Sequence, residues 1–303
     1  MPTSTDGRPS MNELLVTKSL GNKRGFVRIV DVSARDGLQS AAPVLSAASR
    51  AGWVKALLDA GVDEVEACSF VNPKLLPQMA DAAGVLAELG GYEERVWSLV
   101  PNLRGLKLAI DAGARNVVCL LSLTEAHSRA NLGRDIESVL ADLEEVAELG
   151  RSAGVNMRLS TSMTWVCPQE GKVPSTRTMG YLRRAREMGF SRLTLCDTYG
   201  CASPLHVEEL LALVAEEFDP ADVGLHLHDT FGVAGANTLV ALMQGYRRFE
   251  GSIGGLGGCP FAEGAKGNMD TIDLVYLLRS LGYEVGIDME RLKGVAGDCL
   301  KLL

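Results

Sequence analysis

The sequence predicts an α/β fold, a (β/α)8 TIM barrel in a single domain, with a disordered N-terminal leader and an extra C-terminal helix. Short apolar segments of strand length alternate with amphipathic helical segments along nearly the whole chain, and this alternation is typical of parallel sheets. Eight such strand–helix units can be counted, the number that closes a barrel. The length of 303 residues suits one domain of this kind.

The expected strands, in chain order, are 27–32, 63–67, 95–99, 116–121, 157–161, 192–196, 223–227 and 249–253. The expected helices are 44–60, 74–89, 104–112, 134–153, 175–188, 204–217, 233–246 and 269–281, with a last helix at 288–301. Glycines that can act as left-handed C-caps follow four of these helices, at Gly61, Gly113, Gly154 and Gly189. An open doubly wound sheet is the alternative. It fits less well because no G-x-G-x-x-G segment follows the first strand.

The composition limits the class of protein. Residues 1–25 are polar and lack the apolar segment of a secretion signal, so we expect a flexible leader before a barrel domain at 26–303. No apolar run reaches the roughly 18 residues that span a bilayer, and a net charge of −8 argues against a nucleic-acid-binding surface. Seven cysteines without a C-x-x-C pair indicate reduced thiols. We therefore expect a cytoplasmic protein that binds neither membranes nor nucleic acid.

The segment LHLHDT, at 225–230, is the most informative in the chain. Alternate side chains of a strand point to the same face, so His226 and His228 should lie together at the end of the seventh strand. Two neighbouring imidazoles suit one metal ion. Two structural histidines at a strand end are the alternative.

Other polar residues follow other expected strands. Active sites of such barrels lie at the C-terminal ends of the strands, and all the candidate residues fall at that end. They are Arg35, Asp36, Glu66, Asp197, His226 and Cys259 as catalytic candidates, joined by His228 and Asn268.

These residues suggest a particular chemistry. One carboxylate, two imidazoles and one amide oxygen, from Asp36, His226, His228 and Asn268, suit a divalent metal ion such as Mg²⁺ or Mn²⁺. Such an ion can acidify a bound hydroxyl, and a neighbouring arginine can hold an enolate oxygen. Cleavage of a carbon–carbon bond in a β-hydroxyacyl compound requires both. Cys259, in a glycine-rich loop, could move a proton to or from the enolate carbon.

Each candidate also has a purely structural explanation. The alternatives are a surface ion pair for Arg35 and Asp36, an edge-strand carboxylate for Glu66, helix caps for Asp197 and Asn268, and a structural thiol for Cys259. Two cations on expected loops, Arg104 and Lys172, are better explained as solvated than as phosphate ligands. Arg104 is nevertheless kept, with Gln39, as a candidate substrate-binding residue.

Several segments resemble the 3-hydroxy-3-methylglutaryl-CoA lyase family, within the metal-dependent barrel lyases and synthases that include isopropylmalate synthase. They are ARDGLQ at 34–39, CSFVNPK at 68–74, PQM at 77–79, PNL at 101–103, HLHDT at 226–230 and the glycine-rich stretch 254–268. The resemblance covers about residues 26–285. It implies Asp36, His226, His228 and Asn268 as metal ligands, Arg35 as the enolate-stabilising cation and Cys259 as the loop cysteine. Glu66 and Asp197 would be supporting carboxylates.

The resemblance also implies the reaction, a retro-Claisen cleavage of an acyl-CoA to acetyl-CoA and a ketoacid, acetoacetate for the namesake substrate. Some family positions differ here: Ser40 and Ala41 follow Gln39, Ala42 stands where a basic residue is expected, and Trp165 stands where the family has a run of small residues. Ile272 replaces a glutamate, and Ser160 or Thr161 replaces a tyrosine. These changes leave open a related acyl substrate.

Two other functional classes stay open from the sequence alone. A Claisen-type synthase of the same group would usually carry an additional C-terminal region, and the chain ends about twenty residues after its last strand–helix unit. A barrel without catalysis is the third hypothesis, although every expected ligand is present. A small-molecule acyl-CoA is the expected partner, and a homodimer is consistent with the family.

Overall fold

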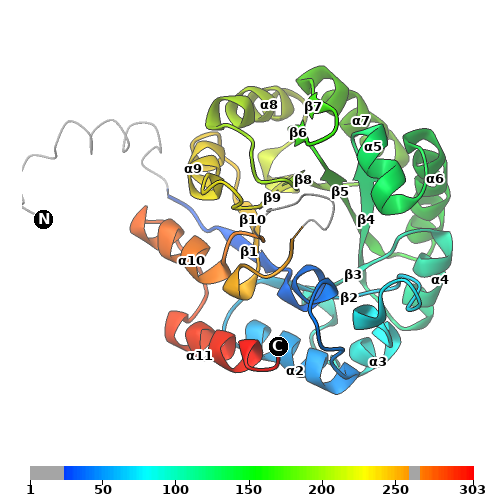
Figure 1. Cartoon of the computed structure of the whole chain (residues 1–303), viewed down its shortest axis with the longest axis vertical. Helices are drawn as coiled ribbons and strands as arrows, with labels where there is room; N and C mark the ends of the chain where they lie inside the picture. Colours follow the sequence, from blue (N-terminus) through cyan, green and yellow to red (C-terminus); the bar gives the residue numbers. More distant parts are fainter. Residues whose placement is uncertain (1–23, 259–266) are drawn as a thin grey trace, which may run out of the picture.

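Eight parallel strands close into a barrel at the centre of the molecule (Figure 1). The computed structural model describes residues 24–258 and 267–303. The barrel strands are β1 Arg28–Asp31, β2 Glu64–Ser69, β3 Val96–Leu99, β4 Asn116–Ser122, β5 Asn156–Ser162, β8 Arg192–Asp197, β9 Val223–Leu227 and β10 Arg248–Gly251. The predicted barrel is confirmed. The open-sheet alternative is wrong, because the first barrel strand, β1, pairs with the last, β10, and no strand of the described sheet is left at an edge.

Helices surround the barrel on the outside (Figure 1). They are α2 Ala47–Asp59, α3 Ala82–Ala87, α4 Leu103–Asp111, α5 Glu125–His127, α6 Ile136–Ser152, α7 Ser175–Met188, α8 Pro204–Glu217, α9 Ala234–Met243, α10 Thr271–Ser280 and α11 Met289–Leu300. The glycines expected to end four of them have the left-handed backbone that C-capping needs, with φ of 96° at Gly61, 83° at Gly113, 69° at Gly154 and 98° at Gly189.

The expected helix at 74–89 is wrong in its first half. Leu76 precedes Pro77 and has an extended φ of −138°, because a residue before proline is excluded from the helical region. A short 3-10 turn, Pro77–Met79, follows, and α3 begins only after Asp81, whose side chain accepts a hydrogen bond from the backbone nitrogen of Gly84. A small hairpin, β6 Val166–Cys167 with β7 Gly171–Lys172, was not predicted.

Charged residues occupy part of the barrel interior, where such folds usually bury branched aliphatic side chains. Glu66 on β2 forms an ion pair with Arg158 on β5. Two strands, β3 and β4, separate these partners in the sheet, so the pair crosses the interior. Nearer the N-terminal ends of the strands, Glu64 accepts two hydrogen bonds from Arg248, at 2.7 and 3.1 Å. Trp97 lies against the Arg158 guanidinium, whose carbon is 4.6 Å from the ring centroid.

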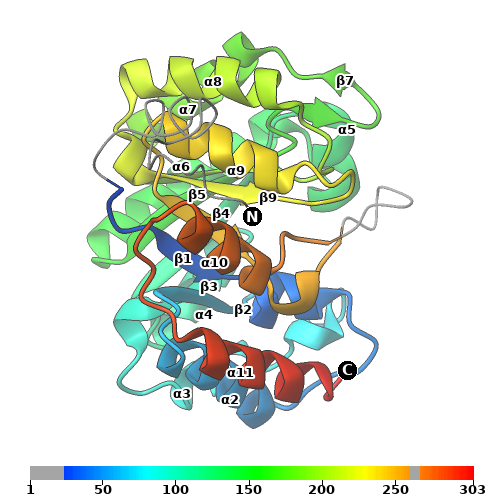
Figure 2. The same cartoon turned by 90° about the vertical axis from the view of Figure 1, so that its left-hand side faces the viewer.

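The C-terminal helix α11 lies alongside α2 on the outside of the barrel (Figure 2). Arg291 of α11 approaches Asp59 of α2 to 3.4 Å, and the backbone nitrogen of Asp288 donates to the carbonyl of Ala60. The predicted extra helix at 288–301 is therefore confirmed. The predicted flexible leader falls almost wholly on residues 1–23, which lie outside the described ranges. No helix within 24–258 and 267–303 combines the length and apolar character needed to cross a membrane.

Candidate metal centre and active site

A single wide helical turn, Ser33–Gly37, positions Arg35 and Asp36 directly after β1. The backbone nitrogen of Asp36 donates to the carbonyl of Val32 at 2.7 Å, and that of Gly37 donates to the same oxygen at 3.2 Å. Both side chains are buried, with Arg35 7% and Asp36 8% exposed. The alternative of a surface ion pair is therefore wrong.

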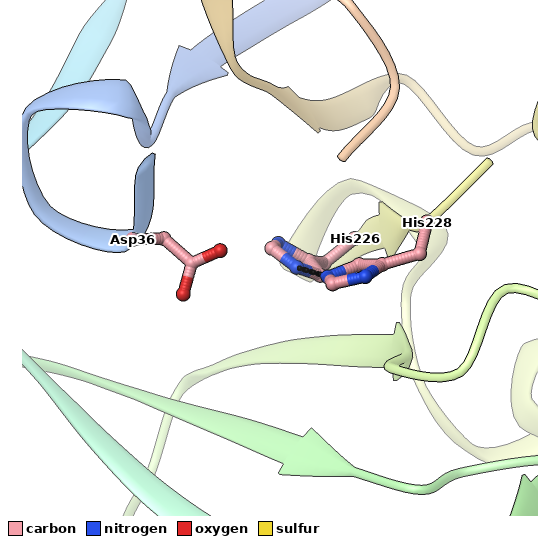
Figure 3. Close-up of side chains that lie close together, drawn as sticks. All are labelled: Asp36, His226 and His228. Atoms are coloured by element: carbon pink, nitrogen blue, oxygen red, sulfur yellow. Dashed lines mark hydrogen bonds between the residues drawn. The ribbon is translucent and has the colours of Figure 1, made fainter. Parts of the chain in front are cut away.

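His226 and His228 lie on one side of the chain at the end of β9, as their spacing predicts. Their Nε2 atoms are 3.1 Å apart, and both rings are buried. The carboxylate of Asp36, which follows β1, points toward the two rings (Figure 3). One potential ligand atom from each of the three residues falls within 4.8 Å of the others. These three side chains could hold a metal ion and are named the metal triad.

Asn268 lies beside the metal triad, as the sequence predicts. Its Nδ2 donates to Asp36 Oδ2 at 2.7 Å and to the carbonyl of Leu256 at 2.9 Å. The alternative that Asn268 caps the following helix is wrong, because α10 begins at Thr271 and Asp270 is its cap.

Arg35 is held by two carboxylates. Its Nε donates to Glu66 Oε2 at 2.7 Å, and its Nη1 donates to Asp36 Oδ1 at 2.6 Å. Burial opposes the charged form, but Glu66 and Asp36 outweigh it and raise the pKa of Arg35 above its usual value, so it stays a cation. Glu66 is completely buried and paired, so the alternative of an edge-strand carboxylate is wrong.

The surroundings of Asp36, His226 and Glu250 shift the pKa of each group. Burial opposes ionisation of Asp36, yet the Arg35 charge and the two imidazoles hold its pKa below the usual range. Burial also opposes protonation of His226, but the hydrogen bond and charge of Glu250 raise its pKa. Glu250 itself has a pKa lowered to about 2: burial opposes this, and Arg158 and His226 outweigh burial. Asp36 therefore offers a carboxylate oxygen to a cation.

Asp197 ends β8 at the same side of the barrel. Its carboxylate accepts backbone hydrogen bonds from Gly200, Cys201 and Ala202 at 3.1, 3.3 and 3.0 Å, and burial raises its pKa to about 6. The alternative that Asp197 caps the next helix is wrong, because Ser203 caps α8. The bonds instead shape the loop that leads from β8 toward α8.

The two predicted substrate-binding residues lie in different surroundings. Gln39 is half-buried and its Nε2 donates to Asp36 Oδ1 at 2.9 Å, so it lies at the candidate site. Arg104 is exposed in the first turn of α4 rather than on a loop. Lys172 is exposed, as expected, 3.5 Å from Glu209. Cys259 lies outside the described residues.

Three residues at or near the site were not predicted. Glu250 Oε2 is 2.8 Å from His226 Nδ1, and Arg158 contacts Glu66 and Glu250. A charge inside a buried barrel strand needs a partner, and this signal could have found both residues. Gly257 has a φ of 96°, and a Cβ there would lie 2.6 Å from Asn268 Nδ2 and 2.8 Å from Asp36 Oδ2. Only glycine lets the backbone approach this closely.

The chain is similar to proteins of one family over most of its length. The HMGL-like family model matches residues 26–298. The mitochondrial hydroxymethylglutaryl-CoA lyase of Macaca fascicularis is 36% identical over 277 residues, which cover 91% of this chain and 85% of the relative. The HMG-CoA lyase structure from Brucella melitensis superimposes with a TM-score of 0.87 at 35% identity, covering 92% of this chain and 99% of the other.

A further structure is an HMG-CoA lyase from Acinetobacter baumannii in complex with coenzyme A and 3-methylmalate. It has a TM-score of 0.87 and 31% identity, and the match covers 91% of each chain. The family model spans nearly all of the described barrel and includes the segments that carry the metal triad and Arg35. The chain belongs to the HMGL-like family.

Proposed function

We propose that this protein is a divalent-metal-dependent lyase that cleaves 3-hydroxy-3-methylglutaryl-CoA, or a closely related 3-hydroxyacyl-CoA, to acetyl-CoA and a ketoacid. For the namesake substrate the ketoacid is acetoacetate. The observation that carries the proposal is the buried juxtaposition of the metal triad with a permanent cation, Arg35, at the C-terminal end of the barrel. The named activity of relatives at 35–36% identity supports it.

The donor set fits a divalent cation. Asp36, His226 and His228 would hold Mg²⁺ or Mn²⁺ through one oxygen and two nitrogens, and this mixture without thiolate suits those ions. Asn268 would add its amide oxygen after a half-turn of the amide, because its nitrogen now faces Asp36. When bound, the ion supplies Lewis acidity that lowers the pKa of the substrate 3-hydroxyl.

The reaction breaks the C2–C3 bond of the acyl chain. The hydroxyl oxygen passes its proton to a water molecule and becomes the ketone oxygen, and the electron pair of the broken bond moves onto the thioester oxygen as an enolate. Arg35 is proposed to hold that oxygen, because Glu66 and Asp36 fix its guanidinium beside the metal triad. Protonation of the enolate carbon then gives acetyl-CoA, with Cys259 as the proposed proton donor. The burial of Arg35 and the metal triad keeps the site partly dry.

The remaining predicted residues have supporting roles in this proposal. Glu66 positions Arg35, and Asp197 positions the loop that follows β8. Gln39 touches Asp36 and would contact the acyl group, whereas exposed Arg104, at the start of α4, would contact a CoA phosphate. An acyl-CoA partner is supported by the relative whose structure contains coenzyme A.

The choice of acyl substrate depends on positions that differ from the family pattern. Trp165 is completely buried and Ile272 half-buried, so of these two changed positions only Ile272 has exposed surface to offer a ligand. Ser160 lies on β5 two residues beyond Arg158 and is 5% exposed. A related substrate with a different 3-substituent therefore remains the alternative.

A thioester panel tests the proposal. Purified protein with Mg²⁺ or Mn²⁺ is assayed for acetyl-CoA release from 3-hydroxy-3-methylglutaryl-CoA, longer 3-alkyl analogues and citramalyl-CoA. We expect release from at least one of these, with the first as the preferred substrate. Release from none of them, together with consumption of acetyl-CoA and a ketoacid, would instead support a synthase.

We also propose a cytoplasmic location and a homodimeric assembly for this protein. Free thiols at the six described cysteines are consistent with a cytoplasmic, reducing environment. Size measurement in solution would decide whether the chain forms a homodimer.

A further inference from the structure

Glu250, on β10, is a buried carboxylate that contacts His226 of the metal triad. Its Oε2 lies 2.8 Å from His226 Nδ1. Its Oε1 accepts a hydrogen bond from Thr194 Oγ1 at 3.1 Å and lies 3.4 Å from Arg158 Nη2. Both oxygens of Glu250 therefore have partners: one contacts His226, and the other contacts Thr194 and Arg158.

Arg158 connects Glu250 to Glu66, the partner of Arg35. The same Nη2 that approaches Glu250 forms an ion pair with Glu66 Oε1. The other oxygen of Glu66 accepts from Arg35 Nε at 2.7 Å, and Arg35 donates to Asp36 at 2.6 Å. An unbroken chain of buried polar contacts thus runs from His226 through Glu250, Arg158 and Glu66 to Arg35, and ends on the metal triad.

We propose that Glu250 is a positioning residue that fixes the tautomer and direction of the His226 ring and, through Arg158, holds His226 and Arg35 in one rigid frame. The inference rests on the proposed function, since it concerns the metal that the proposed lyase would use. It assigns to a pair of interior residues a role that the metal triad and Arg35 cannot supply alone.

The tautomer follows from the chemistry of the contact. An ionised carboxylate can only accept hydrogen bonds, so His226 Nδ1 must carry a hydrogen toward Glu250. In a neutral imidazole the lone pair then resides on Nε2, the atom that faces His228 Nε2. A hydrogen bond of this kind to the far nitrogen also orients a metal-binding imidazole and makes it more basic.

A second interior pair allows the structural explanation to be tested. Glu64 is also buried on a barrel strand, accepts from Arg248 at 2.7 and 3.1 Å and from Trp97 Nε1 at 2.6 Å, and lies two residues before Glu66 on the same strand. If Glu250 only neutralises an interior arginine, loss of either carboxylate should have the same consequences. If Glu250 positions His226, only its loss should change metal binding.

The experiment compares Mn²⁺ binding by calorimetry in wild-type protein, Glu250→Gln and the matched control Glu64→Gln. Glutamine has one acceptor oxygen, and the Arg158 cation should retain it, leaving an NH₂ group that faces His226 Nδ1. We expect Mn²⁺ affinity to fall about 10- to 100-fold in Glu250→Gln and to stay within about threefold of wild type in Glu64→Gln. Equal losses in the two variants, or none in Glu250→Gln, would overturn the inference.

Imidazole ¹⁵N shifts of the metal-free protein give a readout that needs neither metal nor activity, and only four histidines must be assigned. In wild type, at a pH at which the His226 ring is neutral, we expect its proton on Nδ1, and in Glu250→Gln on Nε2. A proton on Nε2 in the wild type would contradict the proposal even if no variant folds. Glu250→Asp keeps the charge and should retain the Nδ1 proton and most of the affinity. Wild-type protein that binds no Mn²⁺ would instead refute the proposed function.

Discussion

Arg35 and Asp36 are adjacent in the chain, but their side chains belong to different parts of the site. Asp36 lies with the metal triad, whereas Arg35 is fixed mainly by Glu66. A guanidinium buried against two carboxylates loses little conformational freedom when it binds a further anion, because it is already oriented. This preorganisation is what stabilisation of an enolate oxygen requires.

Replacement of Arg35 tests that role. We expect Arg35→Met to lower kcat about 10³-fold, the usual cost of removing one oxyanion-stabilising donor. KM should change little, because the contact strengthens in the transition state. Steady-state kinetics measures kcat and KM, and Mn²⁺ calorimetry checks that metal binding is unchanged. Arg184→Met, which removes an exposed partner of Glu137, is the control. A variant that keeps more than about a tenth of the wild-type kcat, a loss under about 1.4 kcal/mol, would leave Arg35 without a catalytic role.

Gly257 provides a second residue-scale prediction. Alanine there combines the strain of a positive φ with a clash against Asp36 and Asn268. Gly245 has a similar φ of 92°, but a Cβ there meets nothing within 4 Å. Both alanine variants should lose about 1–2 kcal/mol of stability, and only Gly257→Ala should lower Mn²⁺ affinity, by about tenfold or more. Chemical denaturation and calorimetry measure the two losses. Equal metal affinity in both variants would argue against close packing of this loop on the metal triad.

The residues at the candidate site differ in how readily the sequence reveals them. His226 and His228 could be placed together because strand periodicity fixes which side chains share a face. Arg158 and Glu250 could not be joined to them in the same way, because their contact depends on which strands oppose each other across the closed barrel. Periodicity within one strand carries no information about such a contact.

At the scale of elements, the end of β1 is tied to three other parts of the fold. Asp31 accepts a hydrogen bond from the backbone nitrogen of Ser33 at 2.8 Å and one from Thr271 Oγ1, at the start of α10, at 2.6 Å. Trp53 of α2 donates to Ser33 Oγ at 2.9 Å. These bonds fix the start of the turn that carries Arg35 and Asp36.

Asp31 should also make stability depend on pH. Burial raises its pKa from 3.8 to about 6 in the folded protein, so the folded state binds the proton more tightly than the unfolded state. Its contribution to the free energy of unfolding is therefore greatest below about pH 4 and is lost as pH rises toward 6, by up to about 3 kcal/mol. We expect the stability of wild type relative to Asp31→Asn, measured by urea unfolding, to fall between about pH 4 and pH 6.

The matched control for this effect is Asp135, the half-buried N-cap of α6. Hydrogen bonds from Ser138 lower the pKa of Asp135, so its contribution is lost as pH falls and the comparison with Asp135→Asn should slope in the opposite direction. A pH-independent difference between wild type and Asp31→Asn would show that Asp31 is ionised at its ordinary pKa.

Most strands and helices could be predicted from the alternation of apolar segments and from the glycines that end helices. The helix expected at 74–89 starts too early, because Leu75, Leu76 and Met79 suggest a helical face there although Pro77 excludes a regular helix. The hairpin β6–β7 has only two residues in each strand. Elements this short leave no periodic pattern in a sequence.

At the scale of the whole molecule, barrel closure brings together residues from the two ends of the chain. Asp36 follows the first strand and Asn268 follows the last, and their side chains are bonded at 2.7 Å. The parallel sheet places every strand end on one side, which is why the location of the site could be predicted from the order of elements alone. The pairing of the charged residues in the barrel interior could not, because it depends on which strands face one another across the closed barrel.

The most direct test of the central claim is a titration of metal-stripped protein with Mn²⁺ while acetyl-CoA release from 3-hydroxy-3-methylglutaryl-CoA is followed. We expect no release after EDTA treatment, and a rise to a plateau at one Mn²⁺ per chain, because the described part of the chain offers one clustered donor set, at Asp36, His226 and His228. Full turnover by the metal-free protein, or a plateau that is unchanged in Asp36→Ala, would contradict the account.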